Sequence, residues 1–302
     1  MPFIRSIRNG LRQLDEWLSH IDRDADPEIR VPPADRTDEI KAFLRSLDQR
    51  DEGARTYLEI HMGRIARTLT LTPPPLRTGR ALELGTYMHM APTLQCVFGY
   101  GEARGAYFGP LGTTESKAVK VQGKEVFRCL VDLFDAERDR FPYEDETFDL
   151  VLACEMFEHM LHDPMHMLLE TNRVLADGGA MILTTPNVAS YTGVARVLEQ
   201  SANPQLYSKY PDPRGEFSET EIPHVREYTP QELGEAVACA GFEVESLFTE
   251  IIPGYNCDLW VKDFLTRNKY STALRGEQIY CVARKRRGAK ITRYPHFLYE
   301  GC

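Results

Sequence analysis

Residues 80–86 read Arg80-Ala-Leu-Glu-Leu-Gly85-Thr86, an apolar run that ends in an acidic residue and then a glycine. The pattern predicts a short buried β-strand that is followed by a sharp turn, because glycine lets the backbone turn and approach a ligand closely. In open α/β sheets, ligands bind at the carboxyl ends of the strands. The stretch therefore predicts either a ligand site at this edge of a sheet or a purely structural turn.

Short apolar runs alternate with helical segments from residue 80 onward, which is typical of repeated β-α units and a mainly parallel sheet. A helix is expected from Pro230 to Ala240, and the two strands after it can form an antiparallel edge. The predicted class is an α/β fold with a Rossmann-like, seven-stranded, mainly parallel sheet and helices on both faces. The strands are expected near residues 80–84, 104–108, 125–131, 148–154, 178–185, 242–249 and 277–284.

Helical periodicity dominates the first 75 residues. Apolar positions recur at helical spacing over residues 3–22, and further helices are expected around residues 40–47 and 57–71, before the prolines at 73–75. Residues 186–229 hold a long irregular stretch with one helical piece at 188–198, and such insertions usually serve a function. We divide the chain into a helical N-terminal extension or lid (1–77), a main domain (78–285, with the insertion at 186–229) and a C-terminal tail (286–302).

The composition is that of an ordinary globular protein, with 302 residues, 42% hydrophobic and 27% charged. A net charge of -9 argues against nucleic-acid binding, because phosphate contacts require concentrated Lys and Arg. Seven cysteines without a C-x-x-C pair argue against a disulfide framework and a thiolate zinc site. With no apolar leader and no run of about 18 apolar residues, we expect no transmembrane segment and a cytoplasmic location. A homodimer stays open.

Further motifs follow the first strand in a fixed order. They are Phe134-Asp-Ala-Glu137, Phe148-Asp149, Gly178-Gly179 and Thr184-Thr-Pro-Asn187. With these motifs, residues 78–285 resemble the class I S-adenosylmethionine-dependent methyltransferases. The resemblance implies S-adenosylmethionine as the cofactor. The residues implied at its site are Glu83 and Gly85 beside the amino-acid part, Asp135 and Ala136 at the adenine, and also Thr86 and Cys154.

The chain departs from that family pattern at two places. Tyr87 and His89 stand where E-x-G-x-G-x-G has its second and third glycines. The end of the second strand, Ala106-Tyr-Phe-Gly109, lacks the acid that normally binds the ribose, and Glu115 is a candidate substitute. A catalytically inactive methyltransferase-like binding protein therefore stays open, whereas an NAD-dependent reductase is disfavoured because G-x-G-x-x-G is absent.

The segment Glu155-Met-Phe-Glu158-His159 directly follows the fourth strand. Positions i, i+3 and i+4 share one face of a helical turn, so two carboxylates and an imidazole can converge there. His224, at the end of the insertion, can return to the same edge. This ligand set suits Mg or Mn better than zinc, because it offers no thiolate. We predict Glu155, Glu158, His159 and His224 as metal ligands, and Glu155, His159 and His224 as catalytic residues.

The order E-x-x-E-H and a downstream His resembles the metal-dependent 2′-O-methyltransferases of small-RNA ends. The closer overall match, which includes Pro186-Asn-Val-Ala189 and Arg226-Glu-Tyr-Thr-Pro230, is to bacterial methyltransferases of polysaccharide or glycolipid biosynthesis. This resemblance implies O-methylation of a hydroxyl on a sugar-like or small-molecule natural-product acceptor. A metal-independent reaction with His159 as general base is the alternative. The acceptor wall is expected to include Tyr191, Tyr207, Tyr210 and Arg226.

Overall fold

The computed structural model describes residues 36–49, 51–76, 79–210, 223–255 and 259–300. All of these described residues belong to one compact unit of the chain. The helix predicted over residues 3–22 lies outside the described residues. The predicted boundary at residues 77 and 78 and the role of the N-terminal segment as a lid stay predictions.

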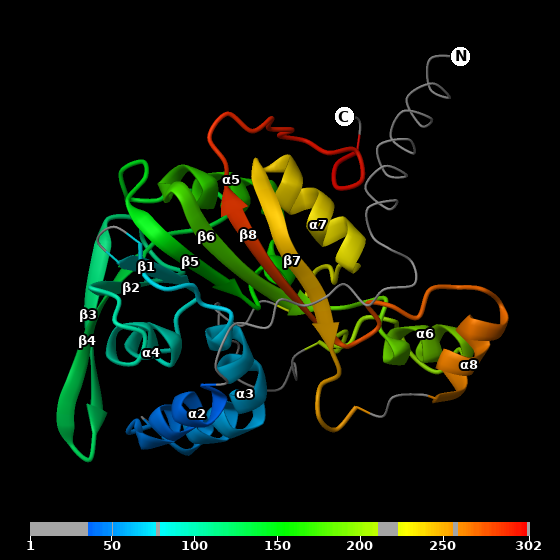
Figure 1. Cartoon of the computed structure of the whole chain (residues 1–302), viewed down its shortest axis with the longest axis horizontal. Helices are drawn as coiled ribbons and strands as arrows, with labels where there is room; N and C mark the ends of the chain where they lie inside the picture. The colour runs from blue at the N-terminus through cyan, green and yellow to red at the C-terminus, as the bar shows by residue number, and fades with distance from the viewer. Residues whose placement is uncertain (1–35, 50, 77–78, 211–222, 256–258, 301–302) are drawn as a thin grey trace. The chain divides into compact units, whose positions relative to one another are not determined.

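An eight-stranded sheet forms the centre of the described part of the chain, in the order β3-β4-β2-β1-β5-β6-β8-β7 (Figure 1). Neighbouring strands from β4 to β6 pair in parallel, whereas β3 runs antiparallel to β4, and β8 runs antiparallel to both β6 and β7. The mainly parallel sheet with an antiparallel edge is as predicted. The strands are β1 (Arg80–Leu84), β2 (Glu102–Tyr107), β3 (Thr113–Val121), β4 (Lys124–Leu133), β5 (Phe148–Cys154), β6 (Leu175–Pro186), β7 (Phe242–Glu250) and β8 (Gln278–Lys285).

The predicted count of seven strands is wrong, because β3 was not foreseen. Its residues are mostly exposed and charged or polar, so they lack the apolar run that marks a buried strand. Gln122 and Gly123 join β3 to β4 with φ angles of 50° and 76°. Two consecutive residues with positive φ are what a type I′ hairpin turn requires. The hairpin places β3 at the exposed edge of the sheet.

Helices cover both faces of the sheet, because alternate residues of the central strands point to opposite sides. Leu150 and Leu152 of β5 pack in the same apolar cluster as α2, α3 and α4. Val151 and Ala153 pack in the cluster that contains α5 and α7. Figure 1 shows these two helical layers on either side of the strands. The helices are α2 (Thr37–Ser46), α3 (Glu52–Thr70), α4 (Met90–Cys96), α5 (Pro164–Val174) and α7 (Pro230–Cys239).

The predicted insertion contains α6 (Tyr191–Leu198), which packs against α8 (Leu259–Arg267) at one end of the sheet (Figure 1). Helix α8 was not foreseen from the sequence. Tyr191 of α6 is buried in this small cluster with Val261 and Leu265 of α8. None of the described helices is long and apolar enough to cross a membrane.

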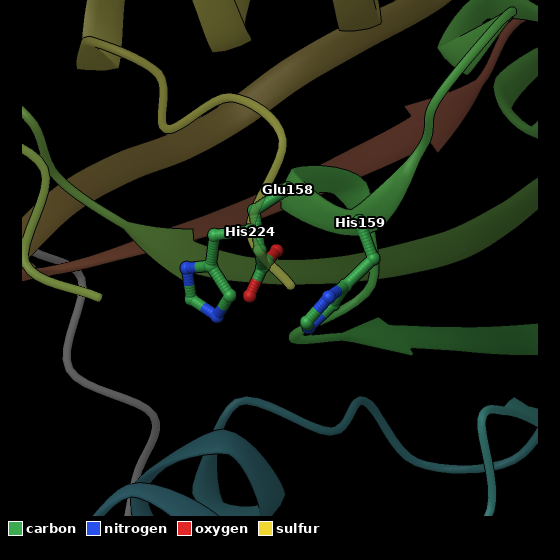
Figure 2. A group of neighbouring side chains, drawn as sticks. All are labelled: Glu158, His159 and His224. Atoms are coloured by element: carbon green, nitrogen blue, oxygen red, sulfur yellow. The ribbon is translucent and has the colours of Figure 1, made fainter. Parts of the chain in front are cut away.

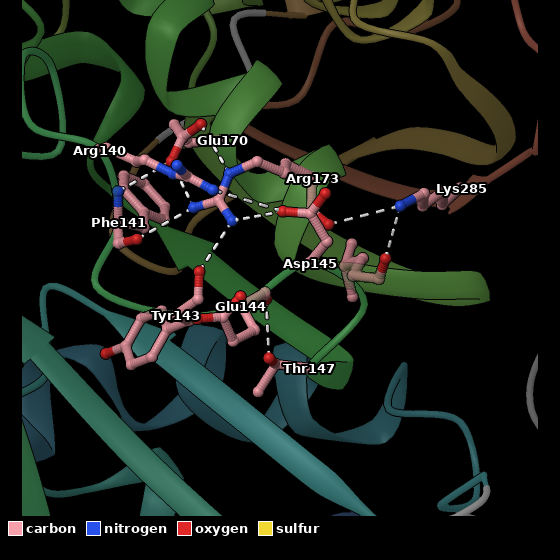
Figure 3. Close-up of polar contacts among 10 residues, drawn as sticks. Arg140, Phe141, Tyr143, Glu144, Asp145, Thr147, Glu170, Arg173 and Lys285 are labelled. Atoms are coloured by element: carbon pink, nitrogen blue, oxygen red, sulfur yellow. Dashed lines mark hydrogen bonds and ion pairs between the residues drawn. The ribbon is translucent and has the colours of Figure 1, made fainter.

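Arg173 of α5 holds the loop between β4 and β5 in place through hydrogen bonds (Figure 3). Its guanidinium donates to the backbone oxygens of Phe141 and Tyr143 at 2.9 and 2.8 Å and to the carboxylates of Asp145 and Glu170. Planar guanidinium donors suit several acceptors at once. This network holds the segment that follows Asp135 against the helical layer of α5.

Substituting Gly276→Ala is expected to lower the free energy of unfolding by about 1–3 kcal/mol, because a new side chain overpacks the end of β7. A Cβ atom at Gly276 would lie 2.4 Å from the backbone carbon of Glu250. Gly63→Ala in α3 is the matched control, since its Cβ would meet nothing within 4 Å. Alanine favours a helix over glycine by about 0.5–1 kcal/mol, so this variant gains stability. Urea unfolding followed by circular dichroism measures both, and equal stabilities would contradict the prediction.

Candidate active site

A cavity of about 1250 Å³ opens at the carboxyl ends of β1, β2, β4 and β5. Its lining includes Gly85 after β1, Phe108 after β2, Asp135 after β4 and Glu155 after β5. Helix α3 supplies a further part of the wall. The cavity therefore lies at the edge of the sheet where the sequence predicts a ligand site.

The buried Glu83 side chain, only 2% exposed, organises the loop after β1. Its Oε2 atom accepts hydrogen bonds from the Thr86 hydroxyl at 2.9 Å and from the Ala91 backbone N–H at 2.8 Å. Gly85 has a φ of 66°, and a Cβ there would lie 2.9 Å from the Met156 sulfur. Glycine therefore lets the loop lie close to the segment after β5. Thr86 holds Glu83 and is not among the residues that line the cavity.

Tyr87 and His89, which replace two glycines of the family pattern, tie the same loop to the N-terminal helices. The Tyr87 ring stacks on Tyr57 of α3 with 5.3 Å between centroids. His89 Nε2 lies 3.2 Å from the Gln49 side-chain oxygen, in the connection between α2 and α3. Burial lowers the pKa of His89 to about 4, so the ring is neutral at physiological pH. Side-chain packing thus shapes the loop where glycines would leave it free.

The end of β2 presents two aromatic residues, Tyr107 and Phe108, to the cavity. Glu115 lies instead on the exposed hairpin strand β3, with its carboxylate 3.2 Å from Lys117 Nζ. The suggested role of Glu115 in place of the ribose acid is therefore wrong. Of the remaining predicted cofactor residues, Asp135, Ala136 and Cys154 all line the cavity.

Glu158, His159 and His224 converge in the cavity wall (Figure 2). One ligand atom from each of the three lies within 4.8 Å of the others. Glu158 is 1% exposed, and its Oε2 accepts a hydrogen bond of 2.8 Å from the Thr185 hydroxyl. Its buried Oε1 has no hydrogen-bond partner among the described residues. This arrangement can hold a metal ion, because a buried carboxylate oxygen without a partner is costly unless a ligand completes it.

A second carboxylate, Glu227, orients His224. His224 Nδ1 lies 3.1 Å from Glu227 Oε1, and the Glu227 side chain is fully buried. The backbone N–H groups of Leu206 and Tyr207 also donate to Glu227, at 2.7 and 2.9 Å. In the tautomer in which Nδ1 donates to the Glu227 carboxylate, Nε2 keeps a lone pair that can bind a ligand. Glu227 was not predicted from the sequence, although it stands three residues after His224.

Glu155 does not lie in this group of three. It has a φ of 54°, and the short 3₁₀ helix η1 begins only at Phe157, so no helical turn joins Glu155 to Glu158. Its Oε1 accepts hydrogen bonds of 2.8 Å from Thr184 and from Gln278. The predicted shared helical face is therefore wrong, because left-handed backbone at the strand end turns Glu155 toward β6 and β8. The two acids are still neighbours: burial, and then the charge of Glu155, raise the pKa of Glu158.

The four residues predicted for the acceptor wall divide into two pairs. Tyr207 and Tyr210 line the cavity. Tyr191 instead donates its hydroxyl to the Thr272 backbone oxygen at 3.1 Å, and Arg226 pairs with Glu232 at 2.6 Å. These contacts hold Tyr191 and Arg226 outside the cavity lining, as parts of the α6–α8 cluster and of the start of α7.

Several lining residues were missed by the sequence reasoning. Gln278 reaches the site because β8 is antiparallel, so its first residue lies at the edge where its neighbour β6 ends. Tyr57, His61 and Arg64 come from α3. Their helical spacing on one face of a predicted helix was a usable signal, but only the packing of α3 shows that this face meets the cavity.

A pH-dependent stability is expected from Glu83. Burial raises its pKa from 4.5 to about 7, against the opposing effect of its hydrogen bonds. Between these values the folded chain keeps a proton that the unfolded chain has released, so stability falls as the pH rises through this window. The loss is at most about 3 kcal/mol, at about 1.36 kcal/mol per pKa unit.

Glu83→Gln removes this contribution while keeping an oxygen for Thr86 and Ala91. Urea unfolding of both proteins from pH 4.5 to 7.5 measures it. Relative to the variant, the wild-type chain should lose stability as the pH rises. Parallel curves for the two proteins would rule the prediction out.

A family model described as a methyltransferase domain matches residues 57–247. The chain belongs to this family of methyltransferase domains. It is therefore a methyltransferase, with S-adenosylmethionine as its cofactor. No curated protein matches the sequence.

Solved structures of similar fold include a SAM-dependent methyltransferase from Archaeoglobus fulgidus, which is 17% identical with a TM-score of 0.48. That match covers 78% of this chain and 100% of the other. A possible histamine N-methyltransferase from Thermotoga maritima is also 17% identical, with a TM-score of 0.47, and the match covers 83% and 100% of the two chains.

The cavity formed by the described residues fits S-adenosylmethionine. Ligand pockets are commonly about 300–1000 Å³, so a cavity of about 1250 Å³ has room for a cofactor and an acceptor together. Its lining includes Gly85, Asp135 and Ala136, which the family resemblance implies at the cofactor, and also Glu158.

Proposed function

We propose that this methyltransferase acts on a hydroxyl group of a sugar-like or small-molecule natural-product acceptor, assisted by Mg or Mn at Glu158, His159 and His224. The observation that carries the proposal is the convergence of these three side chains, with one buried Glu158 oxygen that has no hydrogen-bond partner in the described part of the chain. S-adenosylmethionine, when bound, supplies the methyl group. The residues of the chain must then hold the acceptor oxygen in line and help it to lose its proton.

The donor set supports a divalent cation. One carboxylate and two imidazoles are hard to borderline ligands, and no thiolate lies among them. A divalent ion, when bound there, would act as a Lewis acid on an acceptor hydroxyl. The orientation of His224 by Glu227 matches the usual support of a metal-bound histidine by a carboxylate.

Glu155 supports the same site from outside the group of three. Its carboxylate is fixed by Thr184 and Gln278, and it adds a negative charge beside Glu158. Two acids close together favour a cation between or beside them. We therefore propose Glu155 as a positioning residue of the catalytic centre.

The part of the cavity that we assign to the acceptor has a lining that suits a ring-shaped ligand with hydroxyl groups. Tyr207, Tyr210 and Tyr255 line it, together with Ile251 and Ile252. Tyrosine combines an apolar ring face with a hydroxyl that forms hydrogen bonds. Such a wall can pack against the face of a sugar or another ring and also bind its hydroxyl groups.

Metal removal tests this function. A competent acceptor is first found by screening hydroxylated sugars and phenols with labelled cofactor. Exhaustive chelation with EDTA is then expected to abolish transfer, and added Mn or Mg to restore it. Full activity in the chelated sample would contradict the metal-assisted mechanism and favour His159 as a general base.

Alanine variants separate the same two mechanisms. His224→Ala and His159→Ala should lose comparable activity if both bind the metal, whereas the base mechanism predicts a mild effect at His224. His166→Ala is the matched control, because His166 is not one of the three converging residues. Its Nε2 instead forms a hydrogen bond of 2.8 Å with the Asp139 backbone oxygen. It should keep the activity and Mn affinity of the wild type.

Glu227→Gln is expected to weaken Mn²⁺ binding by about 10- to 100-fold, because the histidine loses its charged orienting partner. Titration of free Mn²⁺ by electron paramagnetic resonance measures this affinity without an acceptor. Thermal unfolding checks that the variant is folded. Wild-type affinity in a folded variant would show that His224 needs no such orientation.

A further inference from the structure

One face of α3 forms part of the cavity wall. Tyr57, Ile60, His61 and Arg64 recur at helical spacing, and all four line the cavity. Arg64 is the permanent cation among them, and its side chain is only 11% exposed. A guanidinium carries five N–H donors and keeps its charge in proteins. Its burial must therefore be matched by acceptors.

The polar contacts of Arg64 to the described residues are long. Its Nη2 lies 3.4 Å from the Tyr57 hydroxyl, and its Nη1 lies 3.8 Å from Glu155 Oε1. That Glu155 oxygen already accepts two hydrogen bonds of 2.8 Å, from Thr184 and Gln278. Arg64 thus keeps donors for an acceptor that enters the cavity.

Arg67, about one helical turn further along α3, is an arginine whose guanidinium has a short hydrogen bond to a carboxylate. Its Nε donates to Glu250 Oε1 at 2.7 Å, and its guanidinium lies over the Phe248 ring at 4.9 Å. The two arginines share the same helix and the same charge. They differ in that Arg64 faces the cavity without a short ion pair in the described part of the chain.

The position of Arg64 points to one end of the cofactor. On one side it adjoins Glu155 at the end of β5. On the other it adjoins Tyr57, whose ring stacks on Tyr87 of the loop after β1. S-adenosylmethionine carries a positive sulfonium and one carboxylate, which is its only negative group. That carboxylate is therefore the cofactor group that a buried cation between these two segments attracts most strongly.

We propose that Arg64 binds the carboxylate at the methionine end of S-adenosylmethionine. The proposal rests on the cofactor of the family and goes beyond the metal-assisted function by assigning a cofactor residue outside the sheet. A guanidinium fork matches a carboxylate with two parallel hydrogen bonds. Glu155, beside it, offers a negative charge to the ammonium group of the same amino-acid end.

Calorimetric titration of the full chain with two ligands tests the proposal. S-adenosylhomocysteine keeps the amino-acid end, whereas 5′-methylthioadenosine has the same adenosine and sulfur without it. Arg64→Gln should weaken S-adenosylhomocysteine binding by about 10- to 100-fold, as expected for a charged hydrogen bond, and leave 5′-methylthioadenosine unchanged. Arg64→Lys should lie between the two proteins, because it keeps the charge and loses the fork.

Arg67→Gln is the matched control, since it removes the same charge one turn away. It should leave the ratio of the two affinities as in the wild type. Equal weakening of both ligands by Arg64→Gln, or no weakening of S-adenosylhomocysteine, would overturn the proposal, as would a wild-type chain that does not prefer S-adenosylhomocysteine. The titrations contain neither acceptor nor metal, so failure of the proposed O-methylation would not affect their outcome.

Discussion

Burial of the central strand β5 is the constraint on which the rest of the structure depends. Every residue from Phe148 to Cys154 is buried, which requires helices on both faces of the sheet. Because the neighbours β1 and β6 run parallel to it, the chain leaves β5 at the edge where β1 also ends. The residues after Cys154 are thereby delivered to the cavity, next to the loop that Glu83 organises.

Helix α3 completes this edge and accounts for the altered glycine loop. Tyr87 stacks on Tyr57 of α3 and His89 contacts Gln49 in the connection between α2 and α3, so side chains of this N-terminal region hold the loop. The Arg67 ion pair with Glu250 joins the same helix to the end of β7. A loop built in this way depends on α3 for its shape, which makes the helix part of the binding site as well as part of the wall.

The two acids after β5 have different surroundings, and this difference suggests different roles. Glu155 accepts hydrogen bonds from Thr184 of β6 and Gln278 of β8, whereas the described residues give Glu158 one side-chain donor and leave its other oxygen without a partner. Groups of the same chemistry in unlike environments commonly divide the work of a site. Here Glu155 is fixed in place by its hydrogen bonds. Glu158 is open to a ligand, and it lies beside His159 and beside His224, which Glu227 orients.

The sequence by itself determined the α/β class and seven of the strands, because buried strands need apolar runs that are visible locally. It also predicted that Glu158, His159 and His224 lie in one region, because each of them follows a segment that ends at the same edge of the sheet. It did not reveal β3, whose polar residues carry no such run. Only the tertiary structure decided that Glu155 points away from Glu158, His159 and His224, since the φ angle of Glu155 at the end of β5 sets the direction of its side chain. The same holds for Arg64 and Gln278. Their roles come from contacts between segments that are distant in the sequence: Arg64 and Gln278 both lie beside Glu155, and Gln278 is 123 positions away from it.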